Sequence, residues 1–159
     1  MKFEMEAIGR VEAARSTPED DHWGGAESCI VLADRFEPDA LQGLDDFSHV
    51  EVLFVFDRVD PAKVVAGARH PRNNPDWPAV GIFAQRAKGR PNRIGSTVCR
   101  VLRTEGRRLH VAELDAIDGT PVLDLKPVLR EFLPRGEVRQ PAWPAELMAD
   151  YWKPERPAP

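Results

Sequence analysis

The run at 50–56, VEVLFVF, constrains the fold most, because its apolar residues alternate as a half-buried β-strand requires. One face of the run is entirely apolar and consists of Val50, Val52, Phe54 and Phe56. The other face is mixed and carries His49, Glu51, Leu53, Val55 and Asp57. This pattern predicts a strand whose apolar face packs on the core.

Six more short runs are predicted to be strands, at 6–11, 28–32, 80–84, 97–102, 109–114 and 122–128. Glycine, proline and Asp-Gly signals separate them, and Glu105-Gly106 predicts a tight hairpin between two of them. Helical signals are restricted to 38–44 and 144–151, and we expect a long loop over 60–78. A chain of many short strands is typical of a β-barrel or a β-sandwich, so the predicted class is mainly β.

The length of 159 residues suits one domain, which we place at 1–153 with a disordered tail at 154–159. No run of 18 apolar residues predicts a membrane span, and the N-terminus lacks the pattern of a signal peptide. Cys29 and Cys99 have neither CxxC spacing nor a nearby histidine, so we predict no metal site and expect both to be small buried residues. A reducing, cytoplasmic location is the expectation.

Charge is sorted along the chain although the formal net charge is only −4. Residues 1–60 hold five Lys/Arg against fifteen Asp/Glu, whereas residues 86–108 hold eight cations and one acid. Two interpretations stay open: a solvated face that complements an acidic face on a neighbouring subunit, or a surface that binds phosphates.

Two segments carry the chemistry that the sequence offers, since motifs of Rossmann sites, P-loops, zincins and α/β-hydrolases are all missing. The segment 81–97, GIFAQRAKGRPNRIGST, combines bend-forming Gly and Pro with Arg86, Arg90 and Arg93, which can bind carboxylate or phosphate in a bidentate manner. The segment 114–127, LDAIDGTPVLDLKP, places three aspartates around a turn. By itself that turn is either a structural loop with a surface ion pair or a nucleoside site, in which carboxylates accept from ribose hydroxyls and backbone amides address the base.

The joint occurrence of these two segments, with FSHVEVLFVF upstream, resembles the TrmO/TsaA-like proteins, the tRNA N6-threonylcarbamoyladenosine-37 methyltransferase family. The resemblance covers roughly residues 8–127. It implies a single-domain β-barrel of about seven short strands with long loops, S-adenosylmethionine as cofactor, tRNA as the methyl acceptor and a homodimer with the cofactor site near the subunit interface.

Carried over residue by residue, the resemblance implies a cofactor site and an acceptor site. The cofactor residues would be Phe56, Asp57, Arg86, Asn92, Ile94, Leu114, Asp115, Asp118, Gly119 and Thr120. The acceptor residues would be Lys88, Arg90, Arg93 and Lys126. In an in-line methyl transfer, Asp118, Asp57 and His49 are candidates to take the acceptor's proton. The structural alternative for His49 is a buried imidazole that ties two strands.

The chain departs from the family pattern on the side expected to face the acceptor. It has HWGG at 22–25 in place of a Pro-Arg-Gln run, Ala-Lys-Gly at 87–89 in place of a Ser-Pro-Phe-like run, and Arg93 in place of a proline. Trp23 is a candidate pocket wall. Two alternatives to tRNA methylation therefore stay open: a methyltransferase of the same fold acting on a small molecule, and a nucleotide- or RNA-binding barrel without catalysis.

Overall fold

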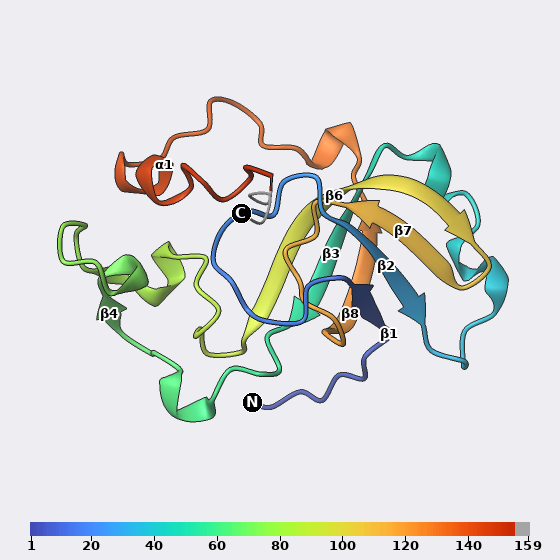
Figure 1. The fold of residues 1–159 in the computed structure, drawn as a ribbon, viewed down its shortest axis with the longest axis horizontal. Helices are drawn as coiled ribbons and strands as arrows, with labels where there is room; N and C mark the ends of the chain where they lie inside the picture. The colour runs from blue at the N-terminus through green and yellow to red at the C-terminus, as the bar shows by residue number, and fades with distance from the viewer. Residues whose placement is uncertain (155–159) are drawn as a thin grey trace, which may run out of the picture.

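Six antiparallel strands close into a barrel in the computed structural model, which describes residues 1–154 (Figure 1). Around the barrel the order is β1 (Gly9–Ala13), β2 (Glu27–Leu32), β7 (Arg108–Ala112), β6 (Ile94–Glu105), β3 (His49–Val55) and β8 (Pro121–Pro127), which pairs back with β1. The mainly β class is confirmed, and of the two architectures that the strand pattern left open the chain adopts the barrel.

The apolar face of β3 points into the barrel as predicted. Val50, Val52 and Phe54 are 0%, 0% and 1% exposed. They pack in one cluster with inward residues of the other strands, namely Val11, Ile30, Cys99, Leu109, Val111 and Val122. Phe56 follows the end of β3 and meets the Phe54 ring edge-on at 5.2 Å between centroids. Both cysteines are buried, as expected.

The tight hairpin predicted at Glu105-Gly106 is confirmed, since it joins β6 to β7. Gly106 has φ +57°, a left-handed conformation that glycine adopts without strain.

The strand predicted at 80–84 is wrong in extent and in place. Only β5 (Val80–Gly81) is extended, and it pairs with β4 (Ala68–Arg69) in a separate small hairpin. Residues 82–84 form the 3₁₀-helix η5 (Ile82–Ala84), because the Ile82 amide donates to Gly67 O and the Gln85 amide to Ile82 O. Residues 82–84 therefore do not pair with a strand of the barrel.

The helices are shorter than predicted. Residues 38–46 form two 3₁₀ turns, η1 (Pro38–Leu41) and η2 (Leu44–Asp46), separated by Gly43 at φ +81°. The C-terminal helix α1 (Trp143–Leu147) ends well before Tyr151 because the chain then pairs its main chain with residues 22–24. The remaining 3₁₀-helices are η3 (Pro61–Lys63), η4 (Pro71–Asn73) and η6 (Arg130–Phe132).

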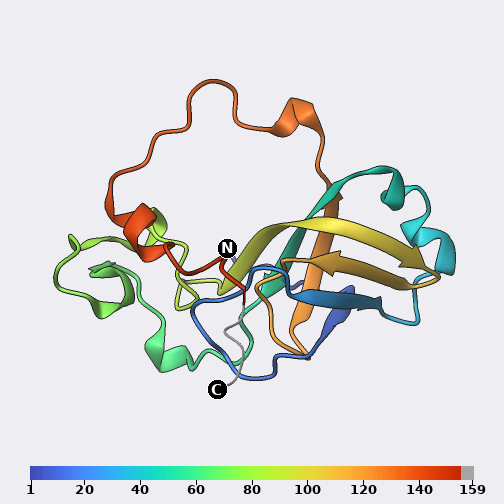
Figure 2. The ribbon, with the colours of Figure 1, turned by 45° about the horizontal axis from the view of Figure 1, so that its top comes forward.

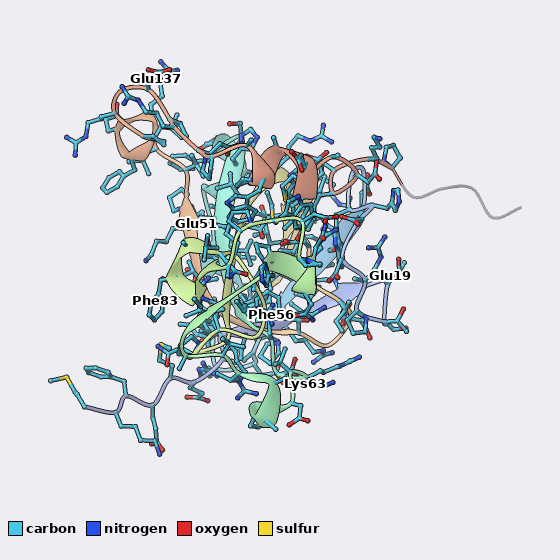
Figure 3. All side chains as sticks on the ribbon, turned by 90° about the vertical axis from the view of Figure 1, so that its left-hand side faces the viewer. Glu19, Glu51, Phe56, Lys63, Phe83 and Glu137 are labelled. Carbon is cyan, nitrogen blue, oxygen red and sulfur yellow. The ribbon has the colours of Figure 1, made fainter. Side chains whose placement is uncertain are left out.

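A layer of loops lies beside the barrel and joins segments distant in sequence. The 60–90 segment, green in Figure 1, lies next to α1, where Trp77 Nε1 donates to Glu146 Oε2 at 2.8 Å. Residues 133–142 instead arch clear of the barrel, with Glu137 on the outlying loop (Figures 2 and 3). Pro154 bridges to Gly24, while the remainder of the predicted tail, 155–159, lies outside the described residues. Within residues 1–154, the helices are all too short or too polar to cross a bilayer.

An ion pair on the outside of the barrel, between Glu12 of β1 and Arg108 of β7, should make the stability of the barrel depend on pH in acid. The hydrogen bond from the Arg108 guanidinium is the largest cause that holds the pKa of the Glu12 carboxyl below its ordinary 4.5. A depressed carboxyl pKa adds stability above the ordinary value, and this stability is lost as pH falls through the lowered pKa. Glu12→Gln should therefore flatten the fall in urea-unfolding free energy below pH 4.5. Glu4→Gln, in the exposed N-terminal arm, should leave the pH profile unchanged; identical profiles for Glu12→Gln and the parent would contradict the prediction.

Candidate functional site

The basic loop, residues 85–93, connects η5 to β6 and is shaped by its own arginines. Arg90 Nη1 donates to Gln85 O at 3.0 Å, and Arg93 Nη1 donates to Val59 O at 3.1 Å. Arg86 donates to Ser96 O on β6. Arg86 and Lys88 are exposed, whereas Arg90 and Arg93 are half-buried. Two of the predicted phosphate ligands thus also hold the loop in its bend.

The aspartate turn, residues 114–120, leads into β8 and is fixed from both sides. The Asp115 carboxylate accepts from the Thr97 hydroxyl on β6 and from the Tyr151 hydroxyl. Asp118 Oδ1 accepts from the Ala13 amide at 3.1 Å. Gly119 has φ +83°, which a glycine at this position of the turn provides without strain.

The amides of residues 118–120 in this turn do not stand free, contrary to the sequence-based picture of amides that address a base. Asp118 N donates to Arg15 O at 2.8 Å, Gly119 N to Val11 O at 2.8 Å and Thr120 N to Ile117 O at 3.2 Å. Because each N–H is a single donor, these three amides are used by the fold and cannot address a base.

The basic loop and the aspartate turn converge at one end of the barrel. The Phe56 amide donates to Arg93 O at 2.9 Å, so the chain after β3 lies against the basic loop. Arg58 Nη2 then donates to Asp118 O at 2.8 Å. On β6, consecutive residues make the second link: Ser96 accepts from Arg86, and Thr97 donates to Asp115. We call the group Arg86, Thr97, Asp115 and Tyr151 the polar cluster.

Most of the remaining predicted cofactor residues lie around the polar cluster. Asn92 lies in the basic loop, and Ile94 begins β6. Asp57 follows Phe56 and is exposed, and Leu114 and Thr120 are buried.

His49 lies at the other end of the barrel from Phe56, and Lys126 lies opposite Glu51 of β3. His49 begins β3, so about 20 Å of strand separates it from Phe56. It is exposed, with Nδ1 2.8 Å from Ser48 Oγ, so the expectation of a buried imidazole is wrong. Lys126, on β8 near the register position of Glu51, pairs with Asp124 at 2.6 Å, and that hydrogen bond raises the pKa of the Lys126 ammonium. Within this chain, neither residue joins the polar cluster.

Unusual backbone conformations border the polar cluster. His22, Arg93 and Glu113 have φ of +64°, +52° and +68°, in the left-handed region where residues other than glycine are strained. Arg93 ends the basic loop, Glu113 precedes the aspartate turn, and His22 lies in the segment that pairs with Tyr151. Strain of this kind costs about 1–3 kcal/mol per residue and gathers at functional sites.

Trp23 is buried beside this region, with the Arg15 guanidinium 4.0 Å above its ring. Its Nε1 is buried without a hydrogen-bond partner in the described chain. The Trp23 amide donates to Tyr151 O at 2.8 Å, so Trp23 lies beside Tyr151.

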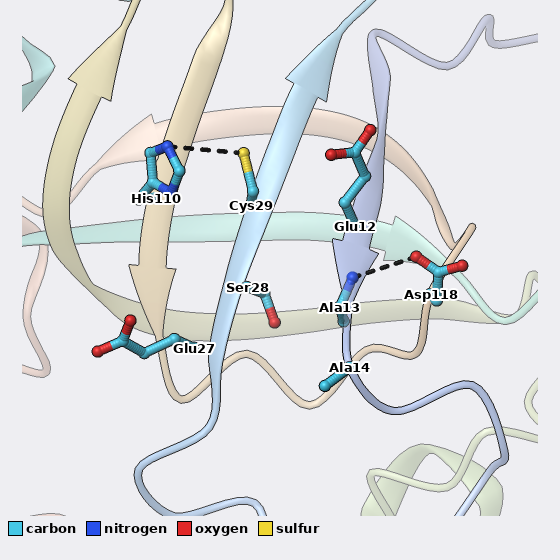
Figure 4. A pocket seen from close by; sticks show the side chains of 8 residues that line it. All are labelled: Glu12, Ala13, Ala14, Glu27, Ser28, Cys29, His110 and Asp118. Atoms are coloured by element: carbon cyan, nitrogen blue, oxygen red, sulfur yellow. Dashed lines mark hydrogen bonds between the residues drawn. The ribbon is translucent and has the colours of Figure 1, made fainter.

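An open hollow of about 410 Å³ touches the predicted site only at Asp118 (Figure 4). It lies over β1, β2 and β7, and its lining includes Glu12, Glu27, Cys29 and His110. Three acids and no lysine or arginine line it, and one of these acids, Glu12, is paired with Arg108 and Arg10. Across residues 1–154, no set of three or more His, Cys, Asp or Glu is grouped to hold a metal ion.

Thr97, Arg58 and Tyr151 contact the aspartate turn of the candidate site but were not predicted. Thr97 lies on the inward face of β6, and Arg58 directly follows Asp57. Tyr151 is the chain's one tyrosine, yet 36 residues separate it from Asp115, and no local pattern announces that contact.

The chain is therefore a small β-barrel protein of six strands. Its candidate site is polar and lies at one end of the barrel, where the basic loop and the aspartate turn are joined. The family model of the tRNA-methyltransferase O N-terminal domain matches residues 11–132. The chain belongs to this family.

Relatives and solved structures agree with that assignment. A tRNA (adenine(37)-N6)-methyltransferase of Mus musculus is 40% identical over 93 residues, covering 58% of this chain and 21% of the relative. An S-adenosyl-L-methionine-binding protein of Archaeoglobus fulgidus is 32% identical over 128 residues, covering 77% and 86%. The crystal structure of TrmO from Pseudomonas aeruginosa superposes with a TM-score of 0.68 at 29% identity, covering 87% of this chain and 62% of that one. The chain thus spans about a fifth of the mammalian relative's length.

Proposed function

We propose that this chain binds S-adenosylmethionine and transfers its methyl group to N6 of threonylcarbamoyladenosine 37 in tRNA. The observation that carries the proposal is the junction of the basic loop and the aspartate turn at the polar cluster. The family assignment and the names of the relatives support it.

The residues at this end fit the chemical parts of an adenosyl-methionine ligand. The exposed guanidinium of Arg86 suits the methionyl carboxylate. Asp115 and Asp118 are carboxylates that accept from ribose hydroxyls, and each keeps lone pairs beyond its contacts within the chain. Phe56, which is half-buried, offers apolar surface at this end of the barrel, whereas Leu114 is fully buried in the core. Because the amides of residues 118–120 are occupied, we expect other groups of the site to hold the base.

The bound cofactor supplies an activated methyl group, so the chain's own task is to position the acceptor nitrogen for in-line attack at about 3–3.5 Å. The acceptor must also lose a proton. Asp57 and Asp118 are exposed carboxylates at the polar cluster's end of the barrel, so they are our candidates, and His49 of the same chain is too distant.

On the acceptor side, Lys88 is the most available cation of the basic loop, although it pairs with Asp20 at 2.9 Å. We propose that Lys88, with the remaining donors of Arg90 and Arg93, contacts phosphates that flank an unstacked base in a single-stranded loop. We propose as well that the protein acts in the cytoplasm as a homodimer. Exposed Val98, on the outer face of β6, would belong to the interface between subunits.

A small-molecule acceptor is the second candidate. The departures at 22–25 and 87–89 both lie in the loop layer. Lys88 of the second departure pairs with Asp20, which lies two residues before the first. Mass spectrometry of tRNA nucleosides from a deletion strain separates the two candidates. Loss of the N6-methylated threonylcarbamoyladenosine is the expected result, and an unchanged level would argue against tRNA as the acceptor.

Arg86→Ala should weaken S-adenosylmethionine binding about 30-fold in calorimetry, because a charge-assisted bond contributes about 2 kcal/mol. Lys88→Ala is the matched control: it should leave cofactor affinity unchanged and lower the salt dependence of tRNA binding by about one charge. If the two variants changed the same affinity to the same degree, the assignment of Arg86 to the cofactor would be wrong.

A further inference from the structure

The C-terminal strap, residues 143–154, returns to the barrel after the outlying loop and is held by several bonds. Its main chain accepts from three consecutive amides, His22 N to Asp150 O, Trp23 N to Tyr151 O and Gly24 N to Lys153 O, at 3.2, 2.8 and 3.2 Å. Gly24 makes this contact feasible, since a Cβ there would lie 2.0 Å from Trp152 O. These bonds fix the position of Tyr151 along the barrel.

Tyr151 reaches from the strap to the carboxylate of Asp115. Its hydroxyl donates to Oδ2, and the Thr97 hydroxyl donates to Oδ1. Each oxygen of the Asp115 carboxylate therefore accepts a hydrogen bond from a different residue. An ionised carboxylate accepts about four hydrogen bonds, so two hydroxyl donors orient Asp115 and leave capacity for a ligand.

The Tyr151 hydroxyl keeps its proton. Burial, and then the charge of Asp115, raises the pKa of this phenol well above its ordinary value, while Arg86 and Arg72 oppose the rise. Tyr151 therefore remains the donor of this hydrogen bond, and the Asp115 carboxylate accepts it. A side chain that could lose its proton would instead repel the carboxylate.

We propose that Tyr151 is a positioning residue that orients the Asp115 carboxylate toward the ribose hydroxyls of an adenosyl ligand. This inference rests on the proposed function, because it assigns Asp115 to cofactor binding. The strap lies beyond the 11–132 segment that the family model matches. The proposed role of Tyr151 makes the strap part of the cofactor site.

A double-mutant cycle tests this role. S-adenosylmethionine affinity is measured by calorimetry, with competition for weak binders, for the parent, Tyr151→Phe, Asp115→Asn and the double variant. Tyr151→Phe should bind about tenfold more weakly than the parent, the loss expected for a hydrogen bond to a charged group. In the Asp115→Asn background the same change should alter affinity less than about twofold, because Tyr151 acts through that carboxylate. Lys153→Gln, an exposed strap residue that pairs with Asp150, is the matched control and should bind like the parent.

The outcomes separate the two proposals. A parent protein that fails to bind the cofactor would overturn the proposed function, and this inference with it. A parent that binds, with Tyr151→Phe binding equally well, would overturn the positioning role alone. Equal losses in both backgrounds would also overturn it, because Tyr151 would then act independently of Asp115. Urea unfolding completes the test: a merely structural Tyr151 would shift the unfolding midpoint without moving affinity.

Discussion

Asp115→Asn is expected to bind S-adenosylmethionine about 100-fold more weakly than the parent. The substitution removes the charge that two ribose hydroxyls would share, and each hydrogen bond to a charged group contributes about 1.5 kcal/mol or more. An amide also presents a donor where the carboxylate accepts from Tyr151 and Thr97, so the geometry of the polar cluster is lost as well. Calorimetry with the methyl donor and with S-adenosylhomocysteine measures the change.

Asp124→Asn provides the matched control, because Asp124 lies in the same sequence segment but pairs with Lys126 on β8. We expect its cofactor affinity to equal that of the parent. Unfolding curves of both variants show whether the fold is intact. An Asp115→Asn protein that is folded and binds with parental affinity would remove Asp115 from the site.

Phe54→Ala is expected to lower the free energy of unfolding by about 3–5 kcal/mol, a large part of the stability of a small domain. Phe54 is 1% exposed, and its ring lies opposite Gly95 on β6. A Cβ at Gly95 would lie 2.4 Å from the ring, so the aromatic side chain fills the space that glycine leaves. Truncation would open a cavity and remove the edge contact with Phe56 beside the candidate site. Urea denaturation monitored by circular dichroism measures the loss.

Phe3→Ala is the corresponding control, since Phe3 is 78% exposed in the N-terminal arm. Its stability should stay within about 0.5 kcal/mol of the parent. A Phe54→Ala protein as stable as the Phe3→Ala protein would mean that the barrel interior repacks without a cavity.

The strands that line the barrel were predictable where a local pattern was strong. Alternation over 50–56 identified β3 and its inward face, and Glu105-Gly106 identified the β6–β7 hairpin. The segment at 80–84 shows the limit of the same reasoning. Its sequence pattern predicts a strand, but the Ile82 amide donates to Gly67 O and the Gln85 amide donates to Ile82 O. The first of these bonds depends on a residue 15 positions away in sequence, which a local pattern does not record.

The candidate site was predictable in part for a similar reason. Arg86 and Asp115 come from two motifs that stand out in sequence, and the structure brings their segments together through Ser96 and Thr97. The structure also assigns Arg90 and Arg93 to carbonyls of their surroundings and occupies the turn amides at 118–120, which motif reasoning treated as available. His49 was grouped with the site through the family resemblance, but the length of β3 carries it to the opposite end.

Taken alone, the sequence determined the mainly β class, the inward face of β3 and the two segments that carry the chemistry, because alternation, turn residues and charge are local properties that hold wherever the chain folds. Barrel closure, the joining of the Arg86 and Asp115 segments through Ser96 and Thr97, and the return of Tyr151 across 36 residues were decided by tertiary structure. Those contacts depend on which hydrogen-bonding groups and apolar faces remain unpaired after the strands assemble, and no local pattern records that outcome.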